Sequence, residues 1–166
     1  PTWSPDGTRI AFVGFVQSDP LTIAKMPPAP KGAKWADPPT IIDQIVYRFD
    51  KKGYIKPGFF HIFVMNPEPG TPRQVTQGNF HHGSSPTGQG GKFDWTPDSK
   101  SLIVSANRHD DYEFQPLNTE LYEISVDDGS VKELTKREGP DNNPCVSRNG
   151  KWIAYTGFDD RYQGHQ

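Results

Sequence analysis

The residues most able to do chemistry are two adjacent histidines, His81 and His82, and two arginines, Arg48 and Arg108, each of which follows an apolar or aromatic segment and begins a loop. Adjacent side chains of an extended chain point in opposite directions, so the two histidines rarely chelate one ion. No cysteine or carboxylate stands at a spacing that completes a metal site with them. We therefore expect neither a metal nor a cofactor.

The arginines are open to two interpretations. A guanidinium at the start of a loop can clamp a carboxylate or pair across domains. The alternative is a structural ion pair with a nearby carboxylate, such as Asp110 or Asp111, and we favour this alternative for both arginines. His109 and Tyr112 lie in the same loop.

Common catalytic and nucleotide-binding motifs are missing from the chain. The segment 88–91 (GQGG) is not followed by a Lys-Ser/Thr pair or a helix start, so it is no phosphate loop. The segment 83–88 does not spell Gly-x-Ser-x-Gly, the nucleophile elbow of hydrolases. The aspartate pairs at 110–111, 127–128 and 159–160 fall in predicted turns without a calcium-loop pattern. We assign no catalytic residue to this chain.

The elements that position these residues follow from an internal repeat. The stretches 3–12 (WSPDGTRIAF), 95–104 (WTPDSKSLIV) and 146–155 (VSRNGKWIAY) align, with seven positions between the first large apolar residue and the start of the apolar run. Pro, Asp and Gly are typical turn residues, and a continuous apolar run is typical of a strand covered on both faces. Ser99 replaces the turn glycine of the second copy, so we expect that turn to be strained or of another type.

A second pair of segments also recurs. IFVM at 62–65 leads to Val75, and LYEI at 121–124 leads to Leu134, with 13 positions between the first residue and the last in both copies. Each unit then has four short antiparallel strands, which is the blade of a β-propeller. The predicted fold class is all-β, a partial propeller of about two and a half blades: 1–77, 78–137 and half a blade in 138–166.

Composition agrees with this class. The chain has 17 prolines and 16 glycines, and 12% of its residues are aromatic, as expected for many short strands joined by turns. A net charge of -2 leaves no excess of basic residues that would indicate nucleic-acid binding. No apolar run approaches the roughly 20 residues of a membrane helix. Cys145 is the only cysteine, which excludes an internal disulfide and fits a cytoplasmic location.

Two insertions interrupt the repeat. The first blade carries about 33 extra residues, within 17–57, between its second and third predicted strands. The segment 27–32 is proline-rich and extended, whereas 41–50 is apolar and is expected to pack or to add strands. Loops of this length are usually functional or disordered, and the aromatic residues favour an ordered, functional loop. The second insertion, 81–91, is expected to be a flexible surface loop.

The repeat units resemble the propellers of the prolyl oligopeptidase family and of TolB-like proteins. The stretches IVYRFDKKGYIKPGFFHIFVMNPEPGTPRQVTQGNFHHGSSP (45–86) and SANRHDDYEFQPLNTELYEISV (105–126) are similar to the acylaminoacyl-peptidase and dipeptidyl-peptidase-like branch. The resemblance covers nearly the whole chain. The third copy departs from the family's Trp-Ser-Pro-Asp-Gly, because it has Val-Ser-Arg-Asn-Gly at 146–150.

This resemblance implies that the chain is a piece of a longer serine peptidase. There, an N-terminal propeller covers a C-terminal α/β-hydrolase domain that carries the catalytic triad, and it admits short peptides while excluding folded proteins. Propeller side chains can help to seat the peptide, and we name Tyr47, Arg48 and Arg108 as candidates. An open propeller fragment is also expected to self-associate through uncovered edges. The alternatives are a TolB-like scaffold that binds protein partners and, third, a propeller lyase or sugar-binding protein.

Overall fold

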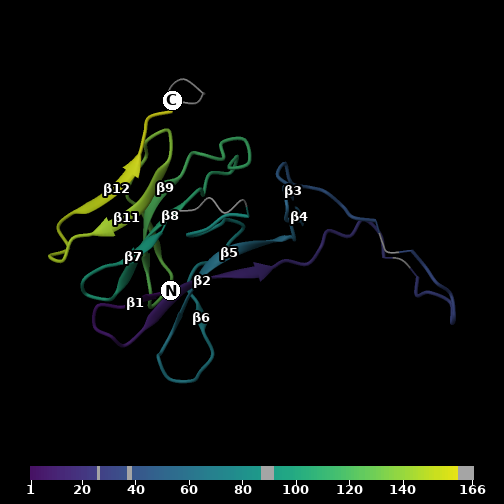
Figure 1. Ribbon diagram of the computed structural model, residues 1–166, viewed down its shortest axis with the longest axis horizontal. Helices are drawn as coiled ribbons and strands as arrows, with labels where there is room; N and C mark the ends of the chain where they lie inside the picture. Colours follow the sequence, from purple (N-terminus) through teal and green to yellow (C-terminus); the bar gives the residue numbers. More distant parts are fainter. Residues whose placement is uncertain (26, 37–38, 87–91, 161–166) are drawn as a thin grey trace.

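The computed structural model describes residues 1–25, 27–36, 39–86 and 92–160, and all regular elements in these ranges are β-strands. Two four-stranded antiparallel sheets lie side by side, followed by a hairpin (Figure 1). This arrangement, together with the structural comparisons reported below, confirms the predicted all-β partial propeller. The blade boundaries at residues 77 and 137 stay predictions. Within the described ranges there is no helix that is long and apolar enough to cross a membrane.

The first two sheets repeat one plan, in which each strand pairs with the next one of its blade. The first sheet has the order β1 (Thr2–Trp3), β2 (Ile10–Gln17), β5 (Gly58–Met65), β6 (Arg73–Gln74). The second has the order β7 (Phe93–Trp95), β8 (Ser101–Ala106), β9 (Glu120–Ser125), β10 (Val131–Glu133). The hairpin consists of β11 (Asp141–Val146) and β12 (Ile153–Gly157), and β11 packs beside β7 and β8.

The constant spacings in the sequence correspond to the registers in which neighbouring strands pair. The residues seven apart face each other across the first two strands of each unit: Trp3 with Ile10, Trp95 with Leu102, and Val146 with Ile153. The residues 13 apart are joined by backbone hydrogen bonds. The N–H of Val75 donates to the carbonyl of Ile62, and that of Leu134 donates to Leu121, at 2.8 Å in both blades. The repeat therefore preserves pairing geometry.

The same pattern of side-chain hydrogen bonds closes each of the three turns. The carboxylate of Asp6 accepts hydrogen bonds from the Ser4 hydroxyl and from the N–H of Thr8, and these bonds hold the pKa of Asp6 down at about 2. Asp98 in the second turn accepts from the Thr96 hydroxyl. In the third turn, the amide oxygen of Asn149 accepts from the Ser147 hydroxyl at 2.8 Å and from the N–H of Lys151 at 3.0 Å. Asn therefore replaces Asp without changing the turn.

The turn that contains Ser99 is of the same type as its two relatives, and it is strained. Ser99 has a φ of 62°, close to the 71° of Gly7 and the 69° of Gly150. The left-handed region costs a residue with a Cβ about 1–2 kcal/mol. Ser99 is buried, and its side chain and carbonyl contact the first blade, which compensates for this strain.

The core lies between the two four-stranded sheets. Its fully buried side chains come from both blades and include Ile62 from the first and Leu102 and Ile124 from the second. Trp95 is 3% exposed and donates its indole N–H to the carbonyl of Thr2 in the first blade. Trp3 has the same repeat position but is 56% exposed. Burial of this tryptophan thus depends on a preceding blade.

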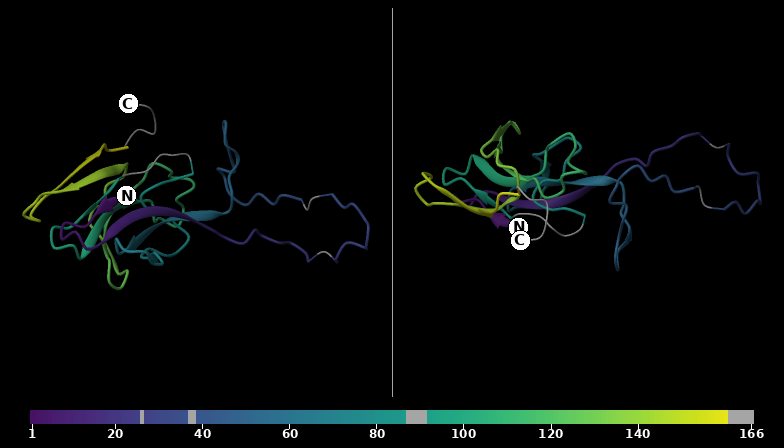
Figure 2. Two further views of the ribbon diagram at one scale, coloured as in Figure 1. Left: turned by 60° about the horizontal axis from the view of Figure 1, so that its bottom comes forward. Right: turned by 90° about the horizontal axis from the view of Figure 1, so that it is seen from above.

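The first insertion leaves the body as a long arm (Figures 1 and 2). It runs from the end of β2 at Gln17 to the start of β5 at Gly58. Part of it forms a short hairpin of β3 (Arg48–Phe49) and β4 (Gly53–Tyr54), so the apolar segment does add strands. The hairpin's side chains are exposed rather than packed into the core.

Candidate functional site

A cavity of about 220 Å³ opens where five separate segments meet. Its lining residues come from the end of the insertion (44–46), the loop after β6 (81–86), the end of β8 (105–107), the loop between β8 and β9 (112–119) and the start of β11 (140–142). Backbone hydrogen bonds hold two of these segments together, because the N–H of Gly83 donates to the carbonyl of Ser105. Strand register thus brings distant residues to one site.

His81 lines this cavity. Its Nδ1 accepts a hydrogen bond from the N–H of Phe60 at 3.1 Å, and its ring packs against Phe59. Burial, and secondarily the nearby His61, lowers the pKa of His81 to about 4, so the ring is neutral at pH 7. A neutral imidazole whose Nδ1 accepts must carry its proton on Nε2.

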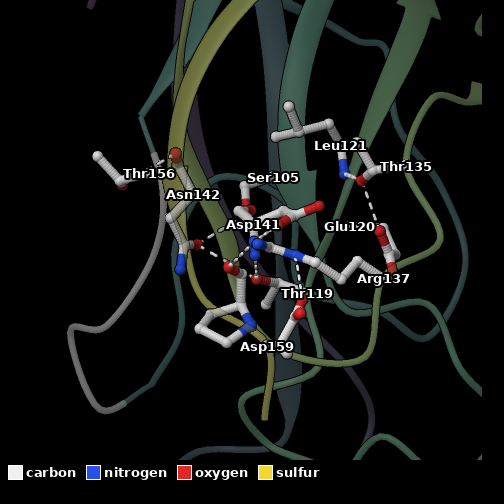
Figure 3. Close-up of polar contacts among 12 residues, drawn as sticks. Ser105, Thr119, Glu120, Leu121, Thr135, Arg137, Asp141, Asn142, Thr156 and Asp159 are labelled. Atoms are coloured by element: carbon white, nitrogen blue, oxygen red, sulfur yellow. Dashed lines mark hydrogen bonds and ion pairs between the residues drawn. The ribbon is translucent and has the colours of Figure 1, made fainter. Parts of the chain in front are cut away.

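Asn142 adds an amide side chain from β11. Its side-chain oxygen lies 2.9 Å from the hydroxyl of Ser105 and 3.4 Å from that of Thr119 (Figure 3). Both hydroxyls also lie on the carbonyl of Asp141, at 2.7 Å and 3.3 Å, so each shares its single hydrogen between two acceptors. These contacts hold the Asn142 side chain beside the end of β8 and the start of β9.

Tyr112 and Glu113 complete the polar lining. Tyr112 packs edge-on against Phe80, and burial, followed by the charges of Glu113 and Asp43, raises its pKa above the usual value of 10. The phenol is therefore protonated at neutral pH and can donate. Among the described lining residues, Glu113 is the only carboxylate. The ammonium of Lys52 lies at the lining and donates a hydrogen bond to the carbonyl of Pro86 at 3.2 Å.

A buried cluster of His61, His82 and Arg108 lies between the two blades. The guanidinium of Arg108 contacts Nε2 of His82 at 2.6 Å and lies over the rings of Phe80 and Tyr122. The imidazoles of His61 and His82 stack at 5.5 Å. His82 is fully buried, and burial, followed by the charges of Arg108 and His61, lowers its pKa to about 3. The cluster therefore holds a neutral His82 beside a charged arginine.

A second buried cluster joins the second blade to the hairpin (Figure 3). The carboxylate of Asp141 is fully buried and forms an ion pair with Arg137, which also contacts Asp159 at 3.5 Å. Glu120 accepts a hydrogen bond from the Thr135 hydroxyl, and burial raises its pKa. The Oδ2 atom of Asp141 has no hydrogen-bond partner in the described part of the chain. This cluster anchors the hairpin to the second blade.

The structure places the three candidate residues apart. Arg108 belongs to the buried cluster and does not line the cavity. None of the ion pairs among the described residues joins Arg108 to Asp110 or Asp111, so the ion pair that we favoured is wrong. Arg108 has structural contacts with His82 and two aromatic rings instead. Tyr47 lines a separate hollow of about 270 Å³ within the arm and packs near Tyr54 at 6.3 Å.

Arg48 lies exposed on β3, where its backbone pairs with that of Tyr54. Its side chain makes no hydrogen bond or ion pair with the described residues, so the structural ion pair favoured for Arg48 is wrong. A role for Arg48 in substrate binding therefore stays a prediction. No group of three or more His, Cys, Asp or Glu in the described ranges could hold a metal ion.

The adjacent histidines diverge, as expected for an extended chain. His81 faces the cavity, whereas His82 faces the interior. The prediction of a flexible surface loop is wrong for these two residues, because His82 is fully buried and His81 is half-buried against Phe59 and Phe60. Residues 87–91 of that loop lie outside the described residues. The sequence carried one signal for this burial, the aromatic pair FF at 59–60 in the preceding strand.

Comparison with known proteins gives a family match over most of the chain. Residues 31–162 match the family described as the dipeptidyl peptidase IV (DPP IV) N-terminal region. A curated relative, the uncharacterised protein Atu1656 of Agrobacterium fabrum, is 26% identical over 163 residues. That match covers 93% of this chain and 49% of the relative, so the chain spans about half the relative's length.

Solved structures with a similar fold are TolB proteins. A structure assigned as TolB from Agrobacterium tumefaciens has a TM-score of 0.54 and 18% identity, covering 99% of this chain and 39% of that one. TolB from Acinetobacter baumannii has a TM-score of 0.52 and 18% identity, covering 96% of this chain and 26% of that one. At this level of identity the likeness establishes the propeller fold.

Proposed function

This chain belongs to the family of the dipeptidyl peptidase IV N-terminal region, and from that premise we propose that it is the non-catalytic propeller segment of a serine peptidase that hydrolyses short peptides. The family match confirms the predicted resemblance to the N-terminal propellers of this peptidase class. The acylaminoacyl-peptidase or dipeptidyl-peptidase character of the whole protein belongs to the proposal. The partner of the propeller is then an α/β-hydrolase domain in the same polypeptide.

The role proposed for the segment is that of a gate and size filter. A propeller over a catalytic domain restricts entry to chains that are narrow enough to pass it. The observation that supports this role is the family match over residues 31–162 in a chain of antiparallel four-stranded sheets. The cavity at the ends of β8 and β11 adds a place where a passing peptide can be held.

The test uses the full natural polypeptide that contains this chain. Short chromogenic peptides are expected to be hydrolysed, and a serine-reactive fluorophosphonate is expected to abolish the activity. A folded protein that carries the same cleavable sequence at its N-terminus is expected to resist. Absence of both hydrolysis and fluorophosphonate labelling contradicts the proposal, and equal cleavage of the folded protein contradicts the size filter.

A second candidate is a TolB-like propeller that serves as a protein-interaction scaffold. The observation that favours it is the fold likeness to TolB structures over nearly the whole chain. This candidate predicts no hydrolysis and stable capture of a protein partner by the intact polypeptide. The fluorophosphonate experiment therefore separates the two functions.

A further inference from the structure

The arm has an exposed outer stretch, residues 22–36, which we call the distal arm. All of its described residues are exposed, and the side chains of Ile23 and Trp35 are 84% and 48% exposed. Figures 1 and 2 show the arm reaching well beyond the two sheets. The hydrogen bonds of its described residues are local, such as that from the N–H of Ala33 to the carbonyl of Pro30 at 3.0 Å. The distal arm therefore holds large apolar side chains in water without support from the body, which is typical of an interaction surface.

The distal arm is also basic. It contains Lys25, Lys31 and Lys34 and no aspartate or glutamate, so its charge is +3. None of these lysines belongs to an ion pair among the described residues. The whole chain has a net charge of -2, so the rest of the chain carries -5, the difference between -2 and +3. The distal arm is therefore attracted to an acidic surface of the same protein.

An acidic and apolar surface lies on the loop between β8 and β9. We call residues 110–117 the acidic loop, which contains no lysine or arginine. Its three carboxylates are those of Asp110, Asp111 and Glu113, and none of them belongs to an ion pair in the part of the chain that the structure describes. Phe114 and Leu117 are 79% and 45% exposed in the same loop. The acidic loop thus complements the distal arm in both charge and polarity.

The acidic loop is held in one shape by its own hydrogen bonds. The N–H of Phe114 donates to the carbonyl of Asp111 at 2.8 Å, and the side chain of Gln115 donates to the Asp111 carboxylate. The side chain of Asn107 donates to the carbonyl of Gln115 at 2.6 Å. A surface that is ordered in advance loses less conformational entropy when a partner binds. Phe114 is therefore a preordered aromatic anchor for a partner.

A second copy of the chain supplies the missing partner of both surfaces. Within one chain the two surfaces do not meet, because the distal arm projects away from the loop between β8 and β9 (Figures 1 and 2). A second copy brings an acidic loop to each distal arm and a distal arm to each acidic loop. Exchange about a two-fold axis therefore forms the same contact twice.

We propose that two copies of the chain exchange their arms, so that the distal arm of each copy lies on the acidic loop of the other. The three lysines then face the three carboxylates, while Ile23 and Trp35 pack with Phe114. This inference goes beyond the proposed function and does not depend on it. It also differs from the association through uncovered edges that the sequence predicts, because no strand edge takes part.

The test is the mass of the full natural polypeptide in solution, measured by light scattering after size-exclusion chromatography and by sedimentation equilibrium. A dimer is expected at micromolar concentration. Raising the salt from about 0.1 M to about 1 M shortens the Debye length from about 10 Å to about 3 Å. The dissociation constant of the dimer is therefore expected to rise about tenfold.

Two charge-reversed variants test which surfaces meet. The arm-reversed variant has Lys25→Glu, Lys31→Glu and Lys34→Glu, and the loop-reversed variant has Asp110→Lys and Glu113→Lys. Each is expected to raise the dissociation constant of its own dimer at least about tenfold, because like charges then face each other in both contacts. An equal mixture of the two variants is expected to form a heterodimer, since each arm then finds a loop of opposite charge. An arm that folds back on its own loop gives no heterodimer.

Two further variants control for net charge and for folding. Lys56→Glu with Lys92→Glu and Lys151→Glu makes the same change in net charge at exposed positions outside the distal arm, and the dissociation constant is expected to stay within about twofold. Phe114→Ser removes the anchor from an exposed position and is expected to weaken the dimer about tenfold without lowering the melting temperature. If a charge-reversed variant does not fold, as judged by its melting curve, Phe114→Ser decides.

A natural polypeptide that is monomeric at every concentration overturns the proposal. So does a dimer that the charge reversals or Phe114→Ser leave unchanged, or a mixture of the two folded charge-reversed variants that stays monomeric. Hydrolysis is measured separately on the same protein. If hydrolysis is absent but the heterodimer forms, the peptidase proposal fails and the arm exchange stands.

Discussion

The hydroxyl oxygen of Ser99 accepts a hydrogen bond from the backbone N–H of Asp6 at 3.1 Å, which links the turns of two blades that are 93 positions apart in the chain. Ser99 makes this contact from a left-handed backbone conformation that favours glycine. The guanidinium of Arg9 adds a bond to the Ser99 carbonyl. The contact that Ser99 makes between the blades therefore offsets the backbone strain of its turn.

This relationship predicts that two small substitutions at Ser99 differ in stability. Ser99→Ala loses the bond to Asp6 and keeps the strain, so it is expected to lower the free energy of unfolding by about 1 kcal/mol. Ser99→Gly loses the same bond but relieves the strain of about 1–2 kcal/mol, so it is expected to be more stable than Ser99→Ala. Urea unfolding of both variants measures the difference. If the glycine variant were the less stable of the two, backbone strain at this turn would be excluded.

The strands and their registers could be predicted from sequence because they depend on local chemistry. Spacings of seven and 13 positions correspond to pairs such as Trp3 with Ile10, and the turn residues recur with them. The conformation of Ser99 could not be predicted, since it depends on Asp6 in another blade. The ion pair proposed for Arg108 was wrong for the same reason: its contact, His82, is 26 positions away.

The candidate site was less predictable than the fold. The cavity joins Val46, His81, Ala106 and Asn142, which share no motif and meet only after two sheets and a hairpin have formed. Single residues gave partial signals. The divergence of His81 from His82 followed from the alternation of side chains along an extended chain, but which one faces the cavity depends on the hydrogen bond to Phe60.

The buried His82 predicts loss of stability in mild acid. Its pKa is about 3 in the folded protein and about 6.5 in an unfolded chain, so the unfolded state binds more protons between these values. The free energy of unfolding therefore falls as the pH drops through 6.5 toward 3, by up to about 2 kcal/mol at pH 5 from this group. His81, with a pKa of about 4, adds an effect of similar size at pH 5 in the same direction, because its folded pKa also lies below that pH.

The measurement is the slope of unfolding free energy against pH between 7.5 and 5. His82→Asn is expected to reduce the slope, whatever its stability at pH 7.5, because its side chain does not titrate. His109→Asn serves as the control, since His109 lies in the half-exposed loop after β8. An unchanged slope in His82→Asn would mean that other groups cause the acid sensitivity.

Arg137 is expected to be necessary for the burial of Asp141. Removing one partner of a buried ion pair leaves an uncompensated charge, which costs about 3–5 kcal/mol. Arg137→Gln is therefore expected to destabilise the protein by about 3 kcal/mol, and Arg137→Gln with Asp141→Asn by clearly less. The exposed pair of Lys132 with Glu123 is the control, and Lys132→Gln is expected to change stability by less than about 0.5 kcal/mol. Additive effects of the two substitutions would contradict this coupling.

Substitution of Arg48 tests whether the arm contributes to substrate binding. Its guanidinium is exposed on the β3–β4 hairpin without a partner among the described residues, so its removal should not destabilise the fold. If the arm holds a substrate carboxylate, Arg48→Ala in the full natural polypeptide raises KM for short peptides about tenfold and leaves kcat nearly unchanged, since a uniform binding contact is lost.

Lys56→Ala removes a neighbouring exposed charge and is expected to leave KM within about twofold. A peptide amide, which has no terminal carboxylate, is expected to be insensitive to Arg48→Ala, because it offers no carboxylate for the guanidinium to bind. Unchanged KM and kcat for the free-acid peptide would remove Arg48 from the substrate path.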